Sequence, residues 1–155
     1  MKFSPIILFF VAMLGCGSES PSSKLDTSQK SQEEALDAIT NFGAFVILDE
    51  SDEISLIDLG GTKITDADLV NLKGMTSLKS LTLKGTKISD TGLEHLKGLT
   101  RLKILNLDNT NVSDTGLEHL KGLSSLKWLY LDNTKVTDKG VNKLHKALSN
   151  CDIKR

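Results

Sequence analysis

The chain has few aromatic residues, few cysteines and no excess of either charge. Aromatic residues make up 5% of its 155 residues, with one tryptophan and one tyrosine, so leucine, isoleucine and valine must fill the core. Lysine and arginine number 19 and aspartate and glutamate 20, for a formal net charge of −1. This balance provides no basic footprint for a nucleic acid, and we expect no nucleic-acid partner.

A long membrane-spanning run is also absent. The apolar run at residues 3–14 is shorter than the roughly 20 apolar residues that cross a bilayer. Residues 1–15 instead have the layout of a secretory signal peptide, which is removed from the mature protein. Gly15 followed by Cys16 resembles the lipobox of bacterial lipoproteins, in which the cysteine receives lipid. A plain signal peptide cut near Gly15 and a membrane-retained leader are the alternatives.

Cysteine usage agrees with lipidation, because Cys16 and Cys151 are the only two cysteines and a lipidated Cys16 cannot form a disulfide. We therefore expect an exported protein that is anchored to a membrane of the bacterial cell envelope through lipid on Cys16. Residues 16–32 are rich in serine and poor in core-forming side chains, which predicts a lipid-anchored, disordered tether.

The composition changes at residue 33. Ala35, Leu36, Ile39 and Phe42 recur at helical spacing, and Gly43 is placed to end the helix in the left-handed conformation. Residues 45–48 then predict a short strand, and residues 49–53 an acidic turn. We interpret residues 33–53 as an N-terminal cap of helix and strand, because an open repeat array would expose its core and a strand edge.

A 24-residue pattern recurs four times in residues 54–155 and predicts the architecture. Its aligned columns are Leu59, Leu83, Leu107 and Leu131; Thr62, Thr86, Thr110 and Thr134; Ile64, Ile88, Val112 and Val136; Asp66, Asp90, Asp114 and Asp138; and Leu72, Leu96, Leu120 and Leu144. Leucines at fixed offsets with a period in the twenties are typical of a leucine-rich repeat solenoid. No such unit buries its apolar face alone, so neighbouring units must stack.

Each repeat predicts a strand, a turn and an outer helix. Leu81 and Leu83 alternate with polar residues as in a half-buried strand. Thr86 marks the turn, where its hydroxyl can donate and accept hydrogen bonds. Ser89 and Asp90 then start a helix whose free N–H groups they are expected to cap. In the fourth unit Lys146 replaces the helix-ending glycine, so the helix should continue through Leu148 and a last strand at residues 151–153 should form a C-terminal cap.

The predicted fold class is α/β: a short leucine-rich repeat solenoid with a parallel concave sheet, outer helices and a cap at each end. The motif LxLxxTxI[ST]DxGLxxLxxL resembles bacterial leucine-rich repeat proteins related to the ribonuclease-inhibitor-like, cysteine-containing subtype, and the resemblance covers residues 33–155. It implies protein binding through the concave strand surface, and it brings no catalytic residues.

The sequence offers no convincing catalytic or metal site. His95 and His119 occupy equivalent repeat positions beside Glu94 and Glu118, but no closed set of ligands is visible, so we interpret them as solvent-facing residues. The aspartate column could do acid–base chemistry, but helix capping explains it without a cleft. No nucleophile elbow, phosphate loop or CxxC pair occurs. We predict a protein that is not an enzyme and that has no metal or cofactor.

The open face of the predicted sheet is the candidate binding surface. Trp128 and Tyr130, the only tryptophan and tyrosine, alternate out of the same strand, and these residue types are enriched at binding hot spots. Packing on the C-terminal cap near Ile153 is the alternative explanation for the pair. The predicted binding residues are Trp128, Tyr130, Asp132, Lys127, Asp108, Asn106, Ile104, Lys103, Lys84 and Thr82.

Two functions fit this sequence. The favoured hypothesis is a scaffold that binds an unidentified protein or peptide through the concave strand face. The alternative is a structural or self-associating envelope protein without a dedicated ligand.

Overall fold

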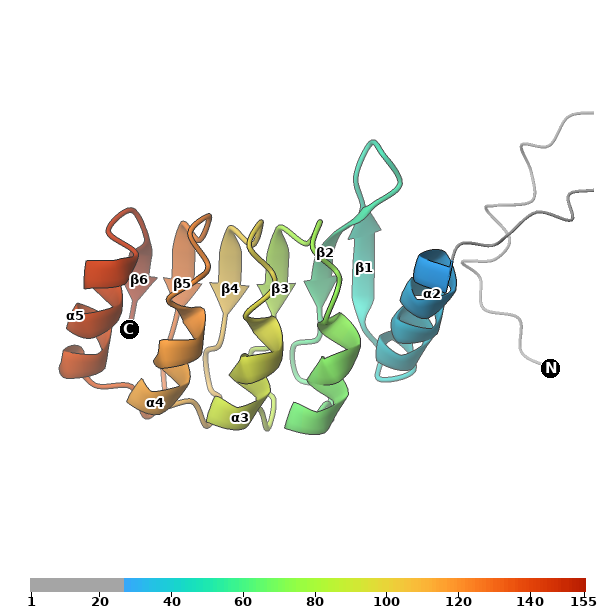
Figure 1. Cartoon of the computed structure of the whole chain (residues 1–155). Coiled ribbons are helices and arrows are strands. Elements are labelled where there is room, and N and C mark those ends of the chain that lie inside the picture. The colour runs from blue at the N-terminus through green and yellow to red at the C-terminus, as the bar shows by residue number, and fades with distance from the viewer. Residues whose placement is uncertain (1–26) are drawn as a thin grey trace, which may run out of the picture.

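The structure, a computed structural model, describes residues 27–155. The expected signal peptide and Cys16 lie outside the described residues. Figure 1 shows two layers, a row of strands and a row of short helices, that progress together along the chain. The elements in order are α2 (Thr27–Thr40), β1 (Phe45–Leu48), β2 (Ile54–Asp58), η1 (Asp66–Leu72), β3 (Ser80–Thr82), α3 (Asp90–Leu93), η2 (Glu94–Leu96), β4 (Ile104–Asn106), α4 (Asp114–Leu117), η3 (Glu118–Leu120), β5 (Trp128–Tyr130), α5 (Asp138–Ala147) and β6 (Asp152–Lys154).

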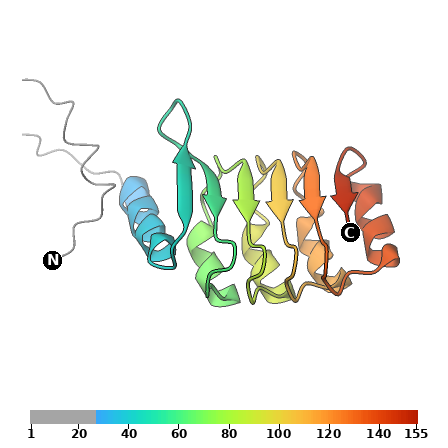
Figure 2. The ribbon, with the colours of Figure 1, turned by 180° about the vertical axis from the view of Figure 1, so that it is seen from behind.

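One six-stranded sheet extends along the whole described chain, in the order β1-β2-β3-β4-β5-β6. β1 pairs antiparallel with β2, and all later pairs are parallel. The parallel register follows the repeat, so Leu81 pairs with Leu105 and Leu105 with Leu129. The helices cover one face of the sheet, and the view from behind in Figure 2 looks onto the other. The predicted α/β solenoid is therefore confirmed.

The core is the thin layer between the sheet and the helices. Leu83 and Leu107 from the strand ends and Ile88 from below the turn are fully buried, as are Leu93 and Leu96 from the helical side. Equivalent positions in the other repeats are buried as well, except the partly buried Val141, and one apolar cluster continues from Ile39 to Cys151. A leucine side chain buried in this way contributes about 1.5–3 kcal/mol of transfer free energy.

Three of the four outer helical segments contain 3₁₀ turns. η1 is 3₁₀ over its seven residues, while α3 and α4 are α-helical for four residues each and continue as the three-residue η2 and η3. A 3₁₀ turn rises about 2.0 Å per residue against about 1.5 Å in an α-helix. The tighter winding lets the few residues left in each repeat reach back to the start of the next strand.

The turn after each strand is closed by the threonine column. Thr86 Oγ1 donates to the carbonyl oxygen of Leu83 at 2.6 Å, and the other three threonines make the same bond in their own repeats. These hydroxyls therefore satisfy carbonyl groups of their own turn and do not link adjacent turns.

The N-terminal cap consists of α2 and β1. Ile39 is fully buried, and Gly43 follows the helix with a φ of +88°, the left-handed conformation expected for it. α2 begins at Thr27, six residues before the predicted start of the cap at residue 33, and so includes the last six residues of the predicted tether. Glutamine and lysine in these six residues are good helix formers, and the apolar positions that follow hold the helix on the solenoid.

The C-terminal cap consists of α5 and β6. α5 is the longest of the outer helices, with 10 residues, and Leu144, Leu148 and Cys151 are buried beneath it. The last strand begins at Asp152, one residue later than the sequence predicts, and pairs parallel with β5. The backbone N–H of Cys151 instead donates to the carbonyl oxygen of Leu148 and turns the chain into the strand.

The leucine column generates a stability prediction. Leu107 is fully buried, so Leu107→Ala should lower the free energy of unfolding by about 2–5 kcal/mol, since it removes apolar contacts and leaves a cavity. Urea unfolding monitored by circular dichroism measures this loss. Val70→Ala is the control, because Val70 is 46% exposed and its truncation should cost much less. An unfolding midpoint unchanged by Leu107→Ala would contradict the assigned repeat register.

Candidate functional site

The candidate site is the open face, defined as the side of the sheet that the helices leave uncovered. Its side chains alternate with the buried Leu81, Leu105 and Leu129. Strand pairing arranges them in two rows across the sheet. The first row is Ile47, Leu56, Ser80, Ile104, Trp128 and Asp152, and the second is Phe45, Asp58, Thr82, Asn106, Tyr130 and Lys154.

The open face carries two groups of exposed apolar side chains. Ile104 is 38% exposed and Trp128 is 42% exposed, on neighbouring strands. Phe45 and Ile47, on the edge strand β1, are 63% and 44% exposed. Thr82, Asn106 and Tyr130 are partly buried between them. Four of the six large apolar side chains that are exposed in the described chain therefore lie on this face.

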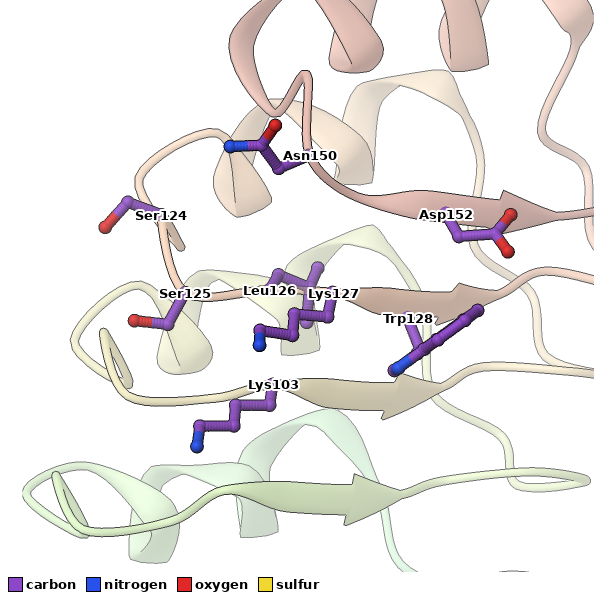
Figure 3. A pocket seen from close by; sticks show the side chains of 8 residues that line it. All are labelled: Lys103, Ser124, Ser125, Leu126, Lys127, Trp128, Asn150 and Asp152. Carbon is purple, nitrogen blue, oxygen red and sulfur yellow. The ribbon is translucent and has the colours of Figure 1, made fainter.

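Trp128 does not pack on Ile153. In the parallel register Ile153 pairs with Leu129, on the core side of the sheet, while the residue beside Trp128 is Asp152. In Figure 3 the indole lies on the open face, on the same side of the ribbon as Lys103. The pair of aromatic residues is thus presented outward, and the alternative of packing against Ile153 is not what the structure has.

Asp108 and Asp132 follow the strands at one margin of the open face, and the carboxylate of Asp108 is engaged in contacts within the fold. Asp108 is 6% exposed; its Oδ1 accepts a hydrogen bond from the backbone N–H of Asp132 at 2.9 Å, and its Oδ2 lies 3.7 Å from Lys84 Nζ. Asn106 Oδ1 accepts a hydrogen bond from the N–H of Asp108. Asp108, one of the predicted binding residues, is therefore buried, and its carboxylate is engaged in these contacts. Asp132 remains exposed.

Three lysines form the opposite margin of the face, at the starts of the strands. Lys79 Nζ lies 2.7 Å from Asp49 Oδ2 of the β1–β2 turn, and this bond holds the pKa of the Asp49 carboxyl below its ordinary value. Lys103 and Lys127 are exposed, and neither forms an ion pair with any residue in 34–155.

A shallow hollow lies between this margin and the C-terminal cap (Figure 3). Its volume is about 510 Å³, and it is lined by Lys103, Ser124, Ser125, Leu126, Lys127, Trp128, Asn150 and Asp152. The hollow combines two ammonium groups, one carboxylate, two hydroxyls and an amide with a leucine side chain and one large aromatic ring. It brings together three of the predicted binding residues, and it lies away from Lys84 and Asp108.

Four residues at the two ends of the face were not predicted from the sequence. Phe45 and Ile47 join it because β1 folds back antiparallel on β2, and Asp152 and Lys154 join it because β6 adds a further strand. The alternation in the segment FVIL and the acidic turn after it were the available signals for the first pair. For the second pair, the only signal was the strand expected in the C-terminal cap.

The aspartate column has a different role from the capping that the sequence suggested. Asp66 Oδ1 accepts from the backbone N–H of Ser89 at 2.8 Å, and Asp66 Oδ2 accepts from its hydroxyl at 2.5 Å. Asp90 binds Ser113, and Asp114 binds Thr137, in the same way. Each carboxylate thus joins its own repeat to the start of the next outer helix. It is engaged in structure and is not available for acid–base chemistry.

A glycine in each following helix makes room for this contact. A Cβ atom added at Gly92 would meet Asp66 Oδ1 at 2.5 Å, and Gly116 and Gly140 face Asp90 and Asp114 in the same way. These glycines are in the helical region, so they are required by close approach and not by an unusual backbone conformation. Asp138, at the end of the column, has no following repeat and pairs with Arg155.

The other candidate groups show no arranged chemistry. His95 and His119 lie on η2 and η3, and no group of three histidine, cysteine, aspartate or glutamate residues within 34–155 is placed to hold a metal. Burial raises the pKa of the Cys151 thiol to about 11, so at neutral pH it is a protonated, packed side chain. No helix of the described chain is long and apolar enough to cross a membrane.

Comparison with known proteins agrees with this architecture. The family model of the leucine rich repeat matches residues 76–136. The structure of an internalin C2 from Listeria monocytogenes is 33% identical, with a TM-score of 0.55, over 64% of this chain and 40% of that chain. The fold is a leucine-rich repeat solenoid.

A second solved structure is similar to this chain in fold alone. The Chaetomium Mex67:Mtr2 structure matches the solenoid with a TM-score of 0.53 at 15% identity, over 82% of this chain and 88% of that chain. No curated protein matches the chain. The leucine-rich repeat chain spans 40% of the length of the internalin C2 that it matches.

The inter-repeat carboxylates generate a prediction about pH. The hydroxyl and the backbone N–H of Thr137 donate to Asp114, and these bonds hold the pKa of its carboxyl below the ordinary value. A carboxyl whose pKa is lower in the folded state stabilises the fold above its unfolded-state pKa of about 3.9. This contribution is lost as the pH falls through the folded-state pKa. Asp114→Asn should therefore lower the free energy of unfolding at neutral pH. The variant should also lose less of this free energy than the wild type does when the pH falls.

Urea unfolding of the wild type and of Asp114→Asn, at neutral pH and at about pH 3, measures this difference. Asp138→Asn is the matched control, because Asp138 stands in the same column without a following repeat. It should lower stability at neutral pH less than Asp114→Asn does. Parallel pH profiles for the wild type and Asp114→Asn would contradict the stabilising role of the inter-repeat bond.

Proposed function

We propose that this leucine-rich repeat solenoid binds a protein or peptide through the open face of its sheet, with Trp128 and Tyr130 as the anchor. The observation that carries the proposal is the exposed Trp128 beside the exposed Ile104, both on strands of a single hydrogen-bonded sheet. Clustered apolar side chains of this kind mark interaction surfaces. Tryptophan and tyrosine, in turn, are among the residues that contribute most to binding energy.

The sheet supports this role because it fixes the side chains before a partner arrives. Backbone bonds from Leu107 to Tyr130 and from Leu131 to Lys154 tie the last three strands together at 2.9 and 2.8 Å. A preorganised surface loses less conformational entropy on binding. The function proposed is that of a scaffold, and it requires no catalytic group.

We propose further that the solenoid is exported and held at a membrane of the bacterial cell envelope by lipid on Cys16. The support is the sequence pattern of residues 1–16, a basic residue, an apolar run and a small residue before cysteine. Two acyl chains of one thioether-linked diacylglycerol suffice for stable attachment, whereas a single chain binds only marginally.

Self-association is a second candidate function, and one observation favours it. β1 is an edge strand of the sheet, and it carries the exposed Phe45 and Ile47. An edge strand with apolar side chains can pair with another chain. Sedimentation analysis of the full chain in detergent separates the candidates, since assembly that rises with concentration and is abolished by Ile47→Lys supports the structural role.

The binding proposal predicts the effect of truncating its anchor. Trp128→Ala should weaken binding of a partner captured from envelope extract by about 2 kcal/mol or more, close to thirtyfold, because it removes a central aromatic contact. Binding is measured with the purified partner, and the unfolding midpoint is measured alongside. Since Trp128 is 42% exposed, the variant should remain folded.

Glu94→Ala and His119→Ala are the controls, because both residues lie on the outer helical side. Each should leave the affinity nearly unchanged. Normal binding by Trp128→Ala would place the site elsewhere, and loss of binding that follows only from unfolding would support a packing role for the indole.

The anchoring proposal predicts that membrane retention depends on Cys16. Cys16→Ser should move the chain from the detergent phase to the soluble fraction, or leave its leader uncleaved, because serine cannot form the thioether. Phase partitioning and immunoblotting of fractionated cells measure this shift. Cys151→Ser is the matched control and should partition as the wild type does. Equal retention of a cleaved Cys16→Ser protein would show that the repeat domain attaches without lipid.

A further inference from the structure

Resting on the proposed binding function, we infer that the segment bound at the open face is acidic. It places a carboxylate side chain between Lys103 and Lys127 and an adjacent apolar side chain against Trp128. The occupant is thus a peptide segment of a partner, with aspartate or glutamate beside an aliphatic or aromatic residue.

The two lysines are placed to act on one carboxylate. They are equivalent residues of successive repeats, and the backbone N–H of Lys127 donates to the carbonyl oxygen of Lys103 at 2.8 Å. Neighbouring strands of a sheet lie about 4.8 Å apart, so one carboxylate can bridge two ammonium groups on long side chains. Figure 3 shows both lysines extending in the same direction along the margin of the hollow.

The charges around the hollow are unequal in a way that favours an acidic partner. Asp152, which also lines it, lies 2.9 Å from Lys154 through its Oδ2, and Asp49 is paired with Lys79. These two carboxylates are thus engaged with other lysines, while Lys103 and Lys127 have no carboxylate partner within residues 34–155. The exposed Asp132 follows the strand, at its opposite end. An acidic side chain of a partner can pair with these two ammonium groups.

The remaining lining groups favour a peptide over a free anion. Ser124, Ser125 and Asn150 offer hydroxyl and amide donors to a carboxylate. Trp128 adds an apolar surface, and Ile104 continues it on the neighbouring strand. A small inorganic anion uses the donors and leaves this apolar surface unused. A segment with an acidic residue and an apolar neighbour uses both.

The test is selection of a random peptide display library on the full chain in detergent. Selected peptides should be enriched in aspartate or glutamate next to an aliphatic or aromatic residue. Affinity is then measured by intrinsic fluorescence, for which the chain offers a single tryptophan, Trp128, at the site itself. Binding should weaken as salt is raised, since exposed charges are screened over about 10 Å at 0.1 M ionic strength.

The decisive variant is Lys103→Glu/Lys127→Glu, which reverses both charges. It should weaken the selected peptides about tenfold or more, as expected for two partly exposed ion pairs turned repulsive. Lys63→Glu/Lys87→Glu is the matched control, because these exposed lysines also lie in successive repeats but follow the turns beyond the strand ends. The control should bind the peptides as the wild type does.

The outcomes separate this inference from the proposed function. Peptides that bind in a Trp128-dependent way but carry no acidic residue, or that bind the double variant unchanged, overturn the inference and leave the binding function standing. Complete competition by inorganic phosphate at equal affinity overturns the assignment to a peptide. Failure to select any peptide whose binding depends on Trp128 overturns the inference together with the proposed function.

Discussion

The structure depends on how closely one repeat approaches the next. Each strand hydrogen-bonds its successor on one side of the solenoid, while on the other side a carboxylate such as Asp90 receives two hydrogen bonds from Ser113. The helical turn can come this near only because a glycine, Gly116, faces the carboxylate. These two lines of contact join successive repeats on both layers, and the leucine columns between them are buried.

Most of the fold could be predicted from the sequence because a period is a long-range restraint. A leucine at position 107 that repeats 24 residues before and after must occupy the same place in each unit, so the parallel register followed directly. The helix starts at Ser89 and equivalent residues were also predictable from local chemistry. What the aspartates bind was not, because a residue one repeat away in space is distant in sequence, and local capping rules favour the nearer partner.

The candidate site was predictable only in part. Alternation along β5 placed Trp128 and Tyr130 outward, as the structure has them. Alternation could not show that Asp108 is buried, because its burial comes from the neighbouring N–H of Asp132. Nor could it place Phe45 on this face, since that requires β1 to reverse direction relative to the repeats. Such features belong to the ends of the array, where the period no longer applies.

The bond between Asp66 and Ser89 has a consequence for how this architecture can change in length. The same bond recurs from Asp90 to Ser113 and from Asp114 to Thr137, so each junction between units is chemically interchangeable with the next. Insertion or removal of one whole unit in the middle of the array leaves every remaining junction intact and adds or removes one strand of the open face. The two caps stay unchanged, and so does β5, the strand that carries Trp128. Gene duplication can therefore lengthen the open face by one strand at a time, because each added unit forms the same contacts as the existing units.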